Sequence, residues 1–207
     1  MDSDIVVHGK GVGNYHSMGE ASEHLAGSAQ CGDQDCGGNS PVVPRYHRAE
    51  ALGLTCRSMT TEDLGFLSAL YASTREDELA PWPWSDEQKA TFLEMQFQAQ
   101  HAHYREHYPD ALWLVLERAG KPIGRLYLEQ WPSEHRIIDI ALMPDTRGQG
   151  VGSALLRDVM DEAAGLSKAV SIHVEKTNPA MRLYKRLGFE TVEDKGVYDL
   201  LRWQPPA

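Results

Sequence analysis

From Leu54 onward, apolar and polar positions recur with regular periods that predict alternating strands and helices. Short runs rich in apolar and β-branched side chains predict strands, since these side chains suit a pleated, half-buried surface. The runs are 54–58, 112–117, 122–130, 136–142, 169–174, 189–192 and 197–203. We therefore expect a single domain built around one central sheet.

Apolar positions three and four residues apart predict the helices between these strands. We expect helices after Thr60 or Thr61, at about 86–107, from Ser153 to about Ala164, and after Asn178. Residues that favour helix ends support these limits, because Ser85 and Asn178 can cap a helix start and Gly188 can end a helix.

Residues 1 to about 50 differ from the rest of the chain. They hold 8 of the 18 glycines, together with scattered Ser, Asn, His and acidic residues that show no apolar period. Such a composition buries too little apolar surface to offset the entropy lost on ordering. We expect a flexible N-terminal extension, or an overlong start, followed by one domain over residues 51–207.

Charge and cysteine content narrow the classes of function. The net charge of −10 argues against nucleic acid as the main partner. No apolar run has the length of a membrane span, so we expect a cytoplasmic protein with no membrane partner. Cys31, Cys36 and Cys56 are expected to be reduced thiols. Cys31 and Cys36 near His24 lack further ligands with zinc spacing, so no metal is expected.

The segment after strand 136–142 has the features of an anion site. Glycines at 148, 150 and 152 allow sharp turns and close approach of main-chain N–H groups to a ligand. The helix that follows directs its positive end to the same point, and Arg147 adds a charged group. A mononucleotide P-loop is excluded because no lysine precedes Ser153, and the dinucleotide Gly-x-Gly-x-x-Gly spacing is also absent.

Two motifs together resemble the GCN5-related N-acetyltransferase (GNAT) superfamily. The first is Arg-x-x-Gly-x-Gly at 147–152, and the second is the Asn, Ala, Leu-Tyr and Gly-Phe series within 175–189. The resemblance extends from about Leu54 to Trp203. It implies an α/β fold with a mixed, mostly antiparallel sheet flanked by helices, in which the fourth and fifth strands splay apart. It also implies acetyl-CoA as co-substrate and transfer of an acetyl group to a primary amine.

The resemblance assigns the cofactor to residues of the fourth strand, the glycine loop and the last helix. They are Ile140, Ala141, Leu142, Met143, Arg147, Gly148, Gln149, Gly150, Val151, Gly152, Ser153, Asn178, Tyr184 and Lys185. Main-chain groups at 140–143 are expected to pair with the amides of the pantetheine arm.

Tyr184 is the candidate acid that protonates the leaving thiolate, with a ring simply packed on the sheet as the alternative. The base is open. Many relatives carry a glutamate where this chain has Arg136, and relatives resembling ribosomal-protein acetyltransferases would place the base at His173. Glu175 shares that strand face. Asp139 and Glu129 are further carboxylates in apolar strands, and each of the four has a structural role as its alternative.

The acceptor pocket is expected where the first two helices and their loop cover the sheet. Its candidate residues are Tyr71, Trp82, Trp84, Tyr127 and Asp139. A small-molecule amine is the first expectation, because a lid formed by the Trp82–Trp84 loop and the long helix at 86–107 suits a closed pocket. A plug that packs over the core is the alternative for this loop. A protein N-terminus or lysine side chain is the second, and a non-catalytic acyl-CoA-binding sensor is the third. A monomer or a homodimer is expected.

Overall fold

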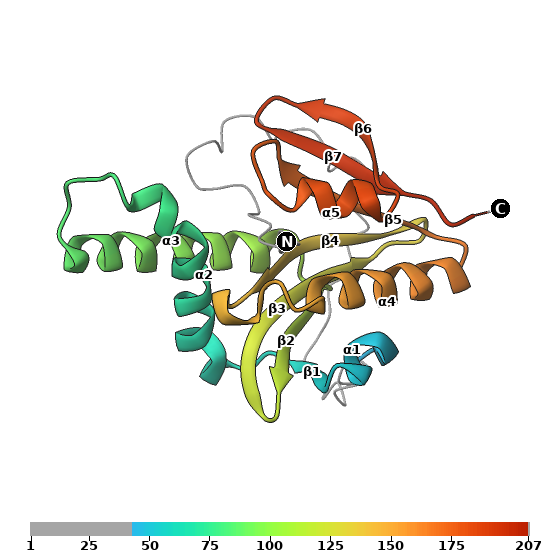
Figure 1. Cartoon of the computed structure of the whole chain (residues 1–207), viewed down its shortest axis with the longest axis horizontal. Helices are drawn as coiled ribbons and strands as arrows, with labels where there is room; N and C mark the ends of the chain where they lie inside the picture. Colours follow the sequence, from blue (N-terminus) through green and yellow to red (C-terminus); the bar gives the residue numbers. More distant parts are fainter. Residues whose placement is uncertain (1–42, 207) are drawn as a thin grey trace, which may run out of the picture.

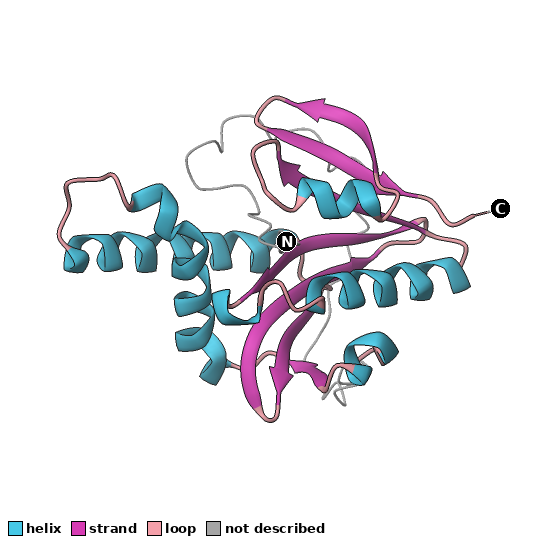
Figure 2. Ribbon diagram, viewed as in Figure 1, coloured by secondary structure: helices cyan, strands magenta, loops and turns pink. Residues whose placement is uncertain are grey.

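A computed structural model describes residues 43–206, and within this range the chain forms one seven-stranded sheet with helices on both faces (Figures 1 and 2). The strand order is β1-β2-β3-β4-β5-β7-β6, and every neighbouring pair is antiparallel except β4 with β5. The expected mixed, mostly antiparallel sheet is therefore confirmed. The strands are β1 Leu54–Ser58, β2 Leu112–Arg118, β3 Lys121–Gln130, β4 Glu134–Leu142, β5 Ala169–Glu175, β6 Glu190–Lys195 and β7 Tyr198–Trp203.

The helices follow the predicted periods closely. They are α1 His47–Ala51, α2 Leu64–Leu79, α3 Asp86–His107, α4 Val151–Gly165 and α5 Met181–Arg186, with short 3₁₀ turns at Thr61–Asp63 and Pro144–Thr146. The start of α3 is fixed by a capping box, in which Ser85 Oγ accepts from the Gln88 N–H at 3.2 Å and Gln88 Oε1 accepts from the Ser85 N–H at 2.9 Å. The predicted cap at Ser85 is confirmed.

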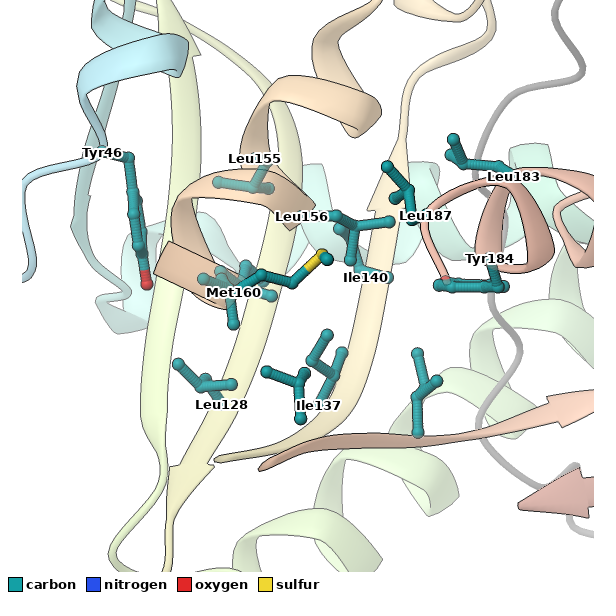
Figure 3. Packing of buried hydrophobic residues seen from close by; sticks show 14 of the residues in the cluster. Tyr46, Leu128, Ile137, Ile140, Leu155, Leu156, Met160, Leu183, Tyr184 and Leu187 are labelled. Carbon is teal, nitrogen blue, oxygen red and sulfur yellow. The ribbon is translucent and has the colours of Figure 1, made fainter. Parts of the chain in front are cut away.

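The main core lies between the sheet and the face covered by α4 and α5. Leu155, Leu156 and Met160 of α4 and Leu183 and Tyr184 of α5 meet the apolar side chains of the strands there (Figure 3). A second apolar cluster on the opposite face joins Tyr104 of α3 to Trp113 and Tyr127 of the sheet. Both faces of the central strands are thus buried, which explains their nearly continuous apolar sequence.

The folded domain begins before residue 51, where the sequence placed its boundary. Tyr46 and Ala49 are buried in the main core, and the Asp158 carboxylate of α4 accepts from the main-chain N–H groups of Arg48 and Ala49 at 3.0 and 2.9 Å. A five-residue helix is too short to show an apolar period, so the sequence pattern did not predict α1. Only its contact with α4 shows that it belongs to the domain. The rest of the expected extension, residues 1–42, lies outside the described residues.

The last helix starts later than expected. The structure begins α5 at Met181, with Ala180 as its N-cap, so the prediction that Asn178 caps this helix is wrong. Asn178 Oδ1 instead accepts from the Ala180 N–H at 2.8 Å and stabilises the turn that leads into the helix. Gly188 follows the helix with φ of +88°, a conformation that suits glycine, and the predicted end is confirmed.

Strands β4 and β5 pair over only part of their length. Their parallel register runs from Glu134 opposite Ala169 to Ile137 opposite Ile172 and then stops. The register of β4 with β3 shifts at the next residue, Ile138, which has no partner on β3. Because a bulge bends and twists a strand, the C-terminal halves of β4 and β5 part beyond this point. This is the predicted splay, and it opens between α4 and α5.

Candidate active site

The glycine loop places the N-terminus of α4 at the open end of the gap between β4 and β5. Gly148 and Gly150 adopt φ of +76° and +78°, and Gly150 is the N-cap of α4. Within the described residues, no side chain caps this helix, and its first turn carries no acidic residue. The first N–H groups of α4, at Val151, Gly152 and Ser153, therefore suit an anion that supplies the missing acceptors.

Several side chains of the loop are used to hold the loop itself. Arg147 Nε donates to the Leu142 carbonyl at 2.9 Å, and its Nη2 lies 3.5 Å from Ser73 Oγ on α2. Gln149 Nε2 donates to the Asp145 carbonyl at 2.6 Å. The sequence predicts that Arg147 binds an anion. In the structure Arg147 connects the glycine loop to the end of β4 and to α2.

Arg118 joins the loop although the sequence did not suggest it. Its Nη1 donates to Gln149 Oε1 at 2.7 Å from the end of β2. A second fixed positive charge therefore lies beside the glycine loop, where it would favour an anion. The residue lies 31 positions before Gln149, so only the fold brings the two together.

The end of β4 can offer main-chain groups to a ligand in the splay. The side chains of Ile140, Ala141 and Leu142 are buried, so only their main chain could meet an extended ligand. Met143 does not fit the same role. Its N–H donates to the Ile123 carbonyl at 2.8 Å, and its carbonyl accepts from Thr146 at 2.9 Å. The main chain of Met143 is therefore used within the protein, and a contact of this residue with the cofactor stays a prediction.

Tyr184 brings a buried hydroxyl to the splay. Its side chain is 0% exposed, points from α5 toward β4, and lies edge-on to Phe189 at 5.5 Å between ring centroids (Figure 3). Its hydroxyl has no hydrogen-bond partner within residues 43–206. Burial, followed by the negative charge of Asp139, raises the pKa of Tyr184 well above its ordinary value. The group is thus a neutral donor, as an acid for a thiolate must be.

Asp139 lies in a buried polar group on the α3 side of the sheet. Its carboxylate is 0% exposed and accepts from Nε and Nη2 of Arg125 at 3.0 and 2.9 Å. The Tyr104 hydroxyl lies 3.4 Å from Asp139 Oδ2, and the Arg125 guanidinium lies over the Tyr127 ring at 5.2 Å. The alternative for Asp139, a structural role, is what the structure shows, and Arg125 is its partner.

His173 and Glu175 occupy the same face of β5, as predicted. Arg136 Nη1 lies 3.0 Å from His173 Nδ1, and arginine can only donate, so Nδ1 must accept this hydrogen bond. Arg136 Nη2 donates to Glu134 Oε1 at 2.9 Å. To act as a base, His173 would have to take a proton on Nδ1. That proton would break the hydrogen bond from Arg136 and put a second positive charge beside the guanidinium, so this geometry opposes His173 as the base. Glu175 ends β5 opposite Tyr198, at the open end of the splay.

The predicted acceptor residues separate into two groups. Tyr71 and Tyr127 are buried near Arg125 and Asp139, so the fold brings these four together. Trp82 and Trp84 are 44% and 36% exposed and contact each other and Phe92 at the far end of α2 and α3 (Figure 1). Their loop joins α2 to α3 on the side away from the sheet (Figure 1), so this arrangement does not support the lid, which stays a prediction.

Two residues of the last helix segment differ in their access to a ligand. Asn178 is buried and uses its Oδ1 within the protein, whereas Lys185 is exposed on α5.

Across residues 43–206, no group of three or more His, Cys, Asp or Glu side chains could hold a metal ion. No helix in the same range is long and apolar enough to cross a membrane.

Comparisons with known proteins agree with this geometry. The model of the Acetyltransferase (GNAT) family matches residues 68–189, more than half of the chain. The peptidyl-lysine N-acetyltransferase YjaB of Salmonella typhimurium is 29% identical over 127 residues, covering 60% of this chain and 83% of that protein. An N-alpha-acetyltransferase of Sulfurisphaera tokodaii is 28% identical over 106 residues, covering 44% of this chain and 62% of that protein.

A solved structure shares the fold. The PaiA N-acetyltransferase of Thermoplasma acidophilum, solved in complex with coenzyme A, superposes with a TM-score of 0.56 and 16% identity, covering 73% of this chain and 98% of that one. The chain therefore belongs to the Acetyltransferase (GNAT) family. It is an N-acetyltransferase that uses acetyl-CoA. The uncapped start of α4 and the buried Tyr184 hydroxyl fit that co-substrate.

Proposed function

We propose that the enzyme acetylates the primary amine of a small molecule. The observation that carries this proposal is the buried Tyr184 hydroxyl, which lacks a hydrogen-bond partner within residues 43–206 and points toward the end of β4. Tyr71, Arg125 and Asp139 are all buried, and Asp139 acts electrostatically on the Tyr184 hydroxyl. A buried reacting group of this kind suits a small acceptor.

Each requirement of acetyl transfer is assigned to a part of the site. Acetyl-CoA supplies the acetyl group as a thioester. The main-chain N–H groups at the start of α4 would hold its pyrophosphate, with Arg118 adding positive charge beside them. The main chain of Ile140 to Leu142 would hold the pantetheine arm in the splay. The Tyr184 hydroxyl would give its proton to the leaving sulfur.

The acceptor nitrogen must lose a proton before it can attack. Glu175 is the better candidate base, because it ends β5 at the open side of the splay and its carboxylate forms no salt bridge within residues 43–206. His173 would first have to release Arg136. We expect Glu175→Gln to reduce turnover more than His173→Gln, and the reverse order in steady-state rates would transfer the role to His173.

A peptide or protein amine is the second candidate acceptor. One relative is named a peptidyl-lysine N-acetyltransferase and another an N-alpha-acetyltransferase. The position of the Trp82–Trp84 loop, on the side away from the sheet, also does not support the lid on which the small-molecule expectation rested.

A panel of acceptors tests the proposal. Thiol release from acetyl-CoA should be measured with amines, amino acids, polyamines, aminoglycosides and short peptides, alongside calorimetric cofactor binding. Turnover of small amines supports the proposal, and turnover of peptides alone replaces it with the second candidate. Cofactor binding without release on any acceptor would contradict both and favour an acyl-CoA-binding sensor.

A further inference from the structure

Arg75 on α2 holds a mostly buried cation whose hydrogen bonds are only partly used. Its side chain is 13% exposed, and Nη1 donates to both carboxylate oxygens of Glu78 at 3.0 and 2.9 Å. Its other donor atoms, Nε and Nη2, are buried and have no hydrogen-bond partner within residues 43–206. Because buried donors of a charged group are rarely left without an acceptor, this edge of the guanidinium calls for a ligand.

Neighbours in two elements place Arg75 near the open end of the splay. Two residues earlier on α2, Ser73 meets Arg147, which in turn holds the carbonyl of Leu142 at the end of β4. On the other side, Arg75 interacts electrostatically with Tyr198, which pairs with Glu175 at the end of β5. Arg75 thus lies close to Tyr198 at the end of β5, on the helix that meets the end of β4 through Ser73.

The unused edge of Arg75 has the geometry that matches a carboxylate. Nε and Nη2 present two roughly parallel N–H groups, which bind the two oxygens of one carboxylate. The neighbouring Arg125 uses the same two atoms for the carboxylate of Asp139, at 3.0 and 2.9 Å. Arg125 already has its carboxylate within the protein, whereas Arg75 offers this edge to something else.

The charge of Arg75 persists despite burial. Burial acts to lower the pKa of its guanidinium, but Tyr71 and Glu78 outweigh burial and hold that pKa above its ordinary value. The Tyr71 ring, predicted to belong to the acceptor pocket, lies under the guanidinium at 5.6 Å. The aromatic face and the charged edge therefore lie together on α2.

We propose that Arg75 binds a carboxylate on the acceptor, so that the substrate is an amino acid or a closely similar amine that carries a carboxylate. This inference rests on the proposed function, because it names the acceptor of the same reaction. A phosphate or carbonyl of acetyl-CoA is the other source of acceptor atoms for Nε and Nη2. The experiment must therefore separate acceptor binding from cofactor binding.

The test compares three matched acceptor sets: the proteinogenic amino acids, their carboxamides, and the amines that lack the carboxyl group. For wild type we expect kcat/KM for the best acid to exceed that for its amide by at least about tenfold. Arg75→Gln should lower kcat/KM for the acid by about 10- to 100-fold. It should leave the amide and the Kd of coenzyme A unchanged. Arg75→Lys should keep part of the preference, and Glu78→Gln, which leaves the proposed edge intact, should keep it whole.

Equal use of acid and amide by wild type would overturn the inference while leaving the proposed function in place. So would an Arg75→Gln variant that binds coenzyme A more weakly and loses all acceptors alike. If wild type acetylates no acceptor, the proposed function fails separately. Calorimetry of the amino acids on the coenzyme A complex then decides, since binding lost in Arg75→Gln supports the carboxylate site and no binding to wild type overturns it.

Discussion

The Arg125 guanidinium and the Asp139 carboxylate form a two-point ion pair across β3 and β4, with side chains 4% and 0% exposed. Removing one partner of such a pair leaves an uncompensated buried charge. We expect Asp139→Asn or Arg125→Met to lower the free energy of unfolding by about 3–5 kcal/mol.

Urea unfolding of both single variants and the double variant Arg125→Met/Asp139→Leu gives the coupling between the two residues. The double variant should lose less stability than either single variant, because no charge is then left unpaired. Additive losses would mean that the pair is not coupled as the geometry requires.

Tyr184→Phe should reduce turnover by about 100-fold with little change in cofactor affinity, because it removes a proton donor and keeps the ring. Tyr46→Phe is a matched control, since Tyr46 also has a buried hydroxyl with no partner in the described part of the chain, but on α1's side of the core. Steady-state rates at saturating substrates measure the effect. Similar rates for the two variants would place the acid elsewhere.

The pH profile checks the same assignment. Because burial and then Asp139 raise the pKa of Tyr184, its hydroxyl stays protonated through neutral and mildly alkaline pH. Any alkaline loss of activity should therefore remain at the same pH in Tyr184→Phe. A shift of that limb on substitution would show that Tyr184 itself ionises there.

Gly150→Val should abolish measurable coenzyme A binding by blocking approach to the start of α4. Gly196→Val is a close control, because Gly150 and Gly196 have φ of +78° and +77° and an added Cβ would meet no atom within 4 Å at either. Both variants should lose about 1–2 kcal/mol of stability from backbone strain. In calorimetry only Gly150→Val should lose the cofactor, and equal affinity in both would refute the loop assignment.

Asp158→Ala should release α1 from the domain, because its carboxylate supplies the acceptors for two N–H groups of that helix. Loss of a helix cap costs about 1–2 kcal/mol. Asp161→Ala removes the other, more exposed carboxylate that pairs with Arg48, and should cost less than about 0.5 kcal/mol. Thermal unfolding of the two variants distinguishes them.

The lowered pKa of Asp63 predicts that part of the free energy of unfolding is lost at acid pH. Hydrogen bonds from Arg57, joined by one from the Thr60 N–H, lower the pKa of Asp63 from 3.8 to about 2, although burial opposes them. A folded-state pKa below the unfolded value stabilises the protein above about pH 4, and this contribution is lost as the pH falls toward about 2. Because Arg57 is partly exposed, we expect about 1–2 kcal/mol. Urea unfolding at several pH values should show it in wild type and not in Asp63→Asn.

Much of this protein was determined by local sequence. The strand at 54–58, the long helix that begins after Ser85 and the glycine loop at 148–152 depend on periodicity, caps and turn residues that act within a few positions. Such interactions are formed by neighbours in the chain, so their pattern can be recognised without the fold. The prediction that Asn178 caps the last helix was wrong because an asparagine side chain accepts from a nearby main-chain N–H both in a turn and at a helix start.

Only the tertiary structure decided how distant residues meet. It paired Arg125 with Asp139, joined His173 to Arg136, placed the loop between α2 and α3 away from the sheet and brought Arg75 close to Tyr198. These relationships depend on strand register, on the bulge at Ile138 and on the path of α2, none of which leaves a periodic mark in the sequence. The sequence therefore specified the elements and the anion loop, and long-range contacts chose the partners that shape the acceptor site.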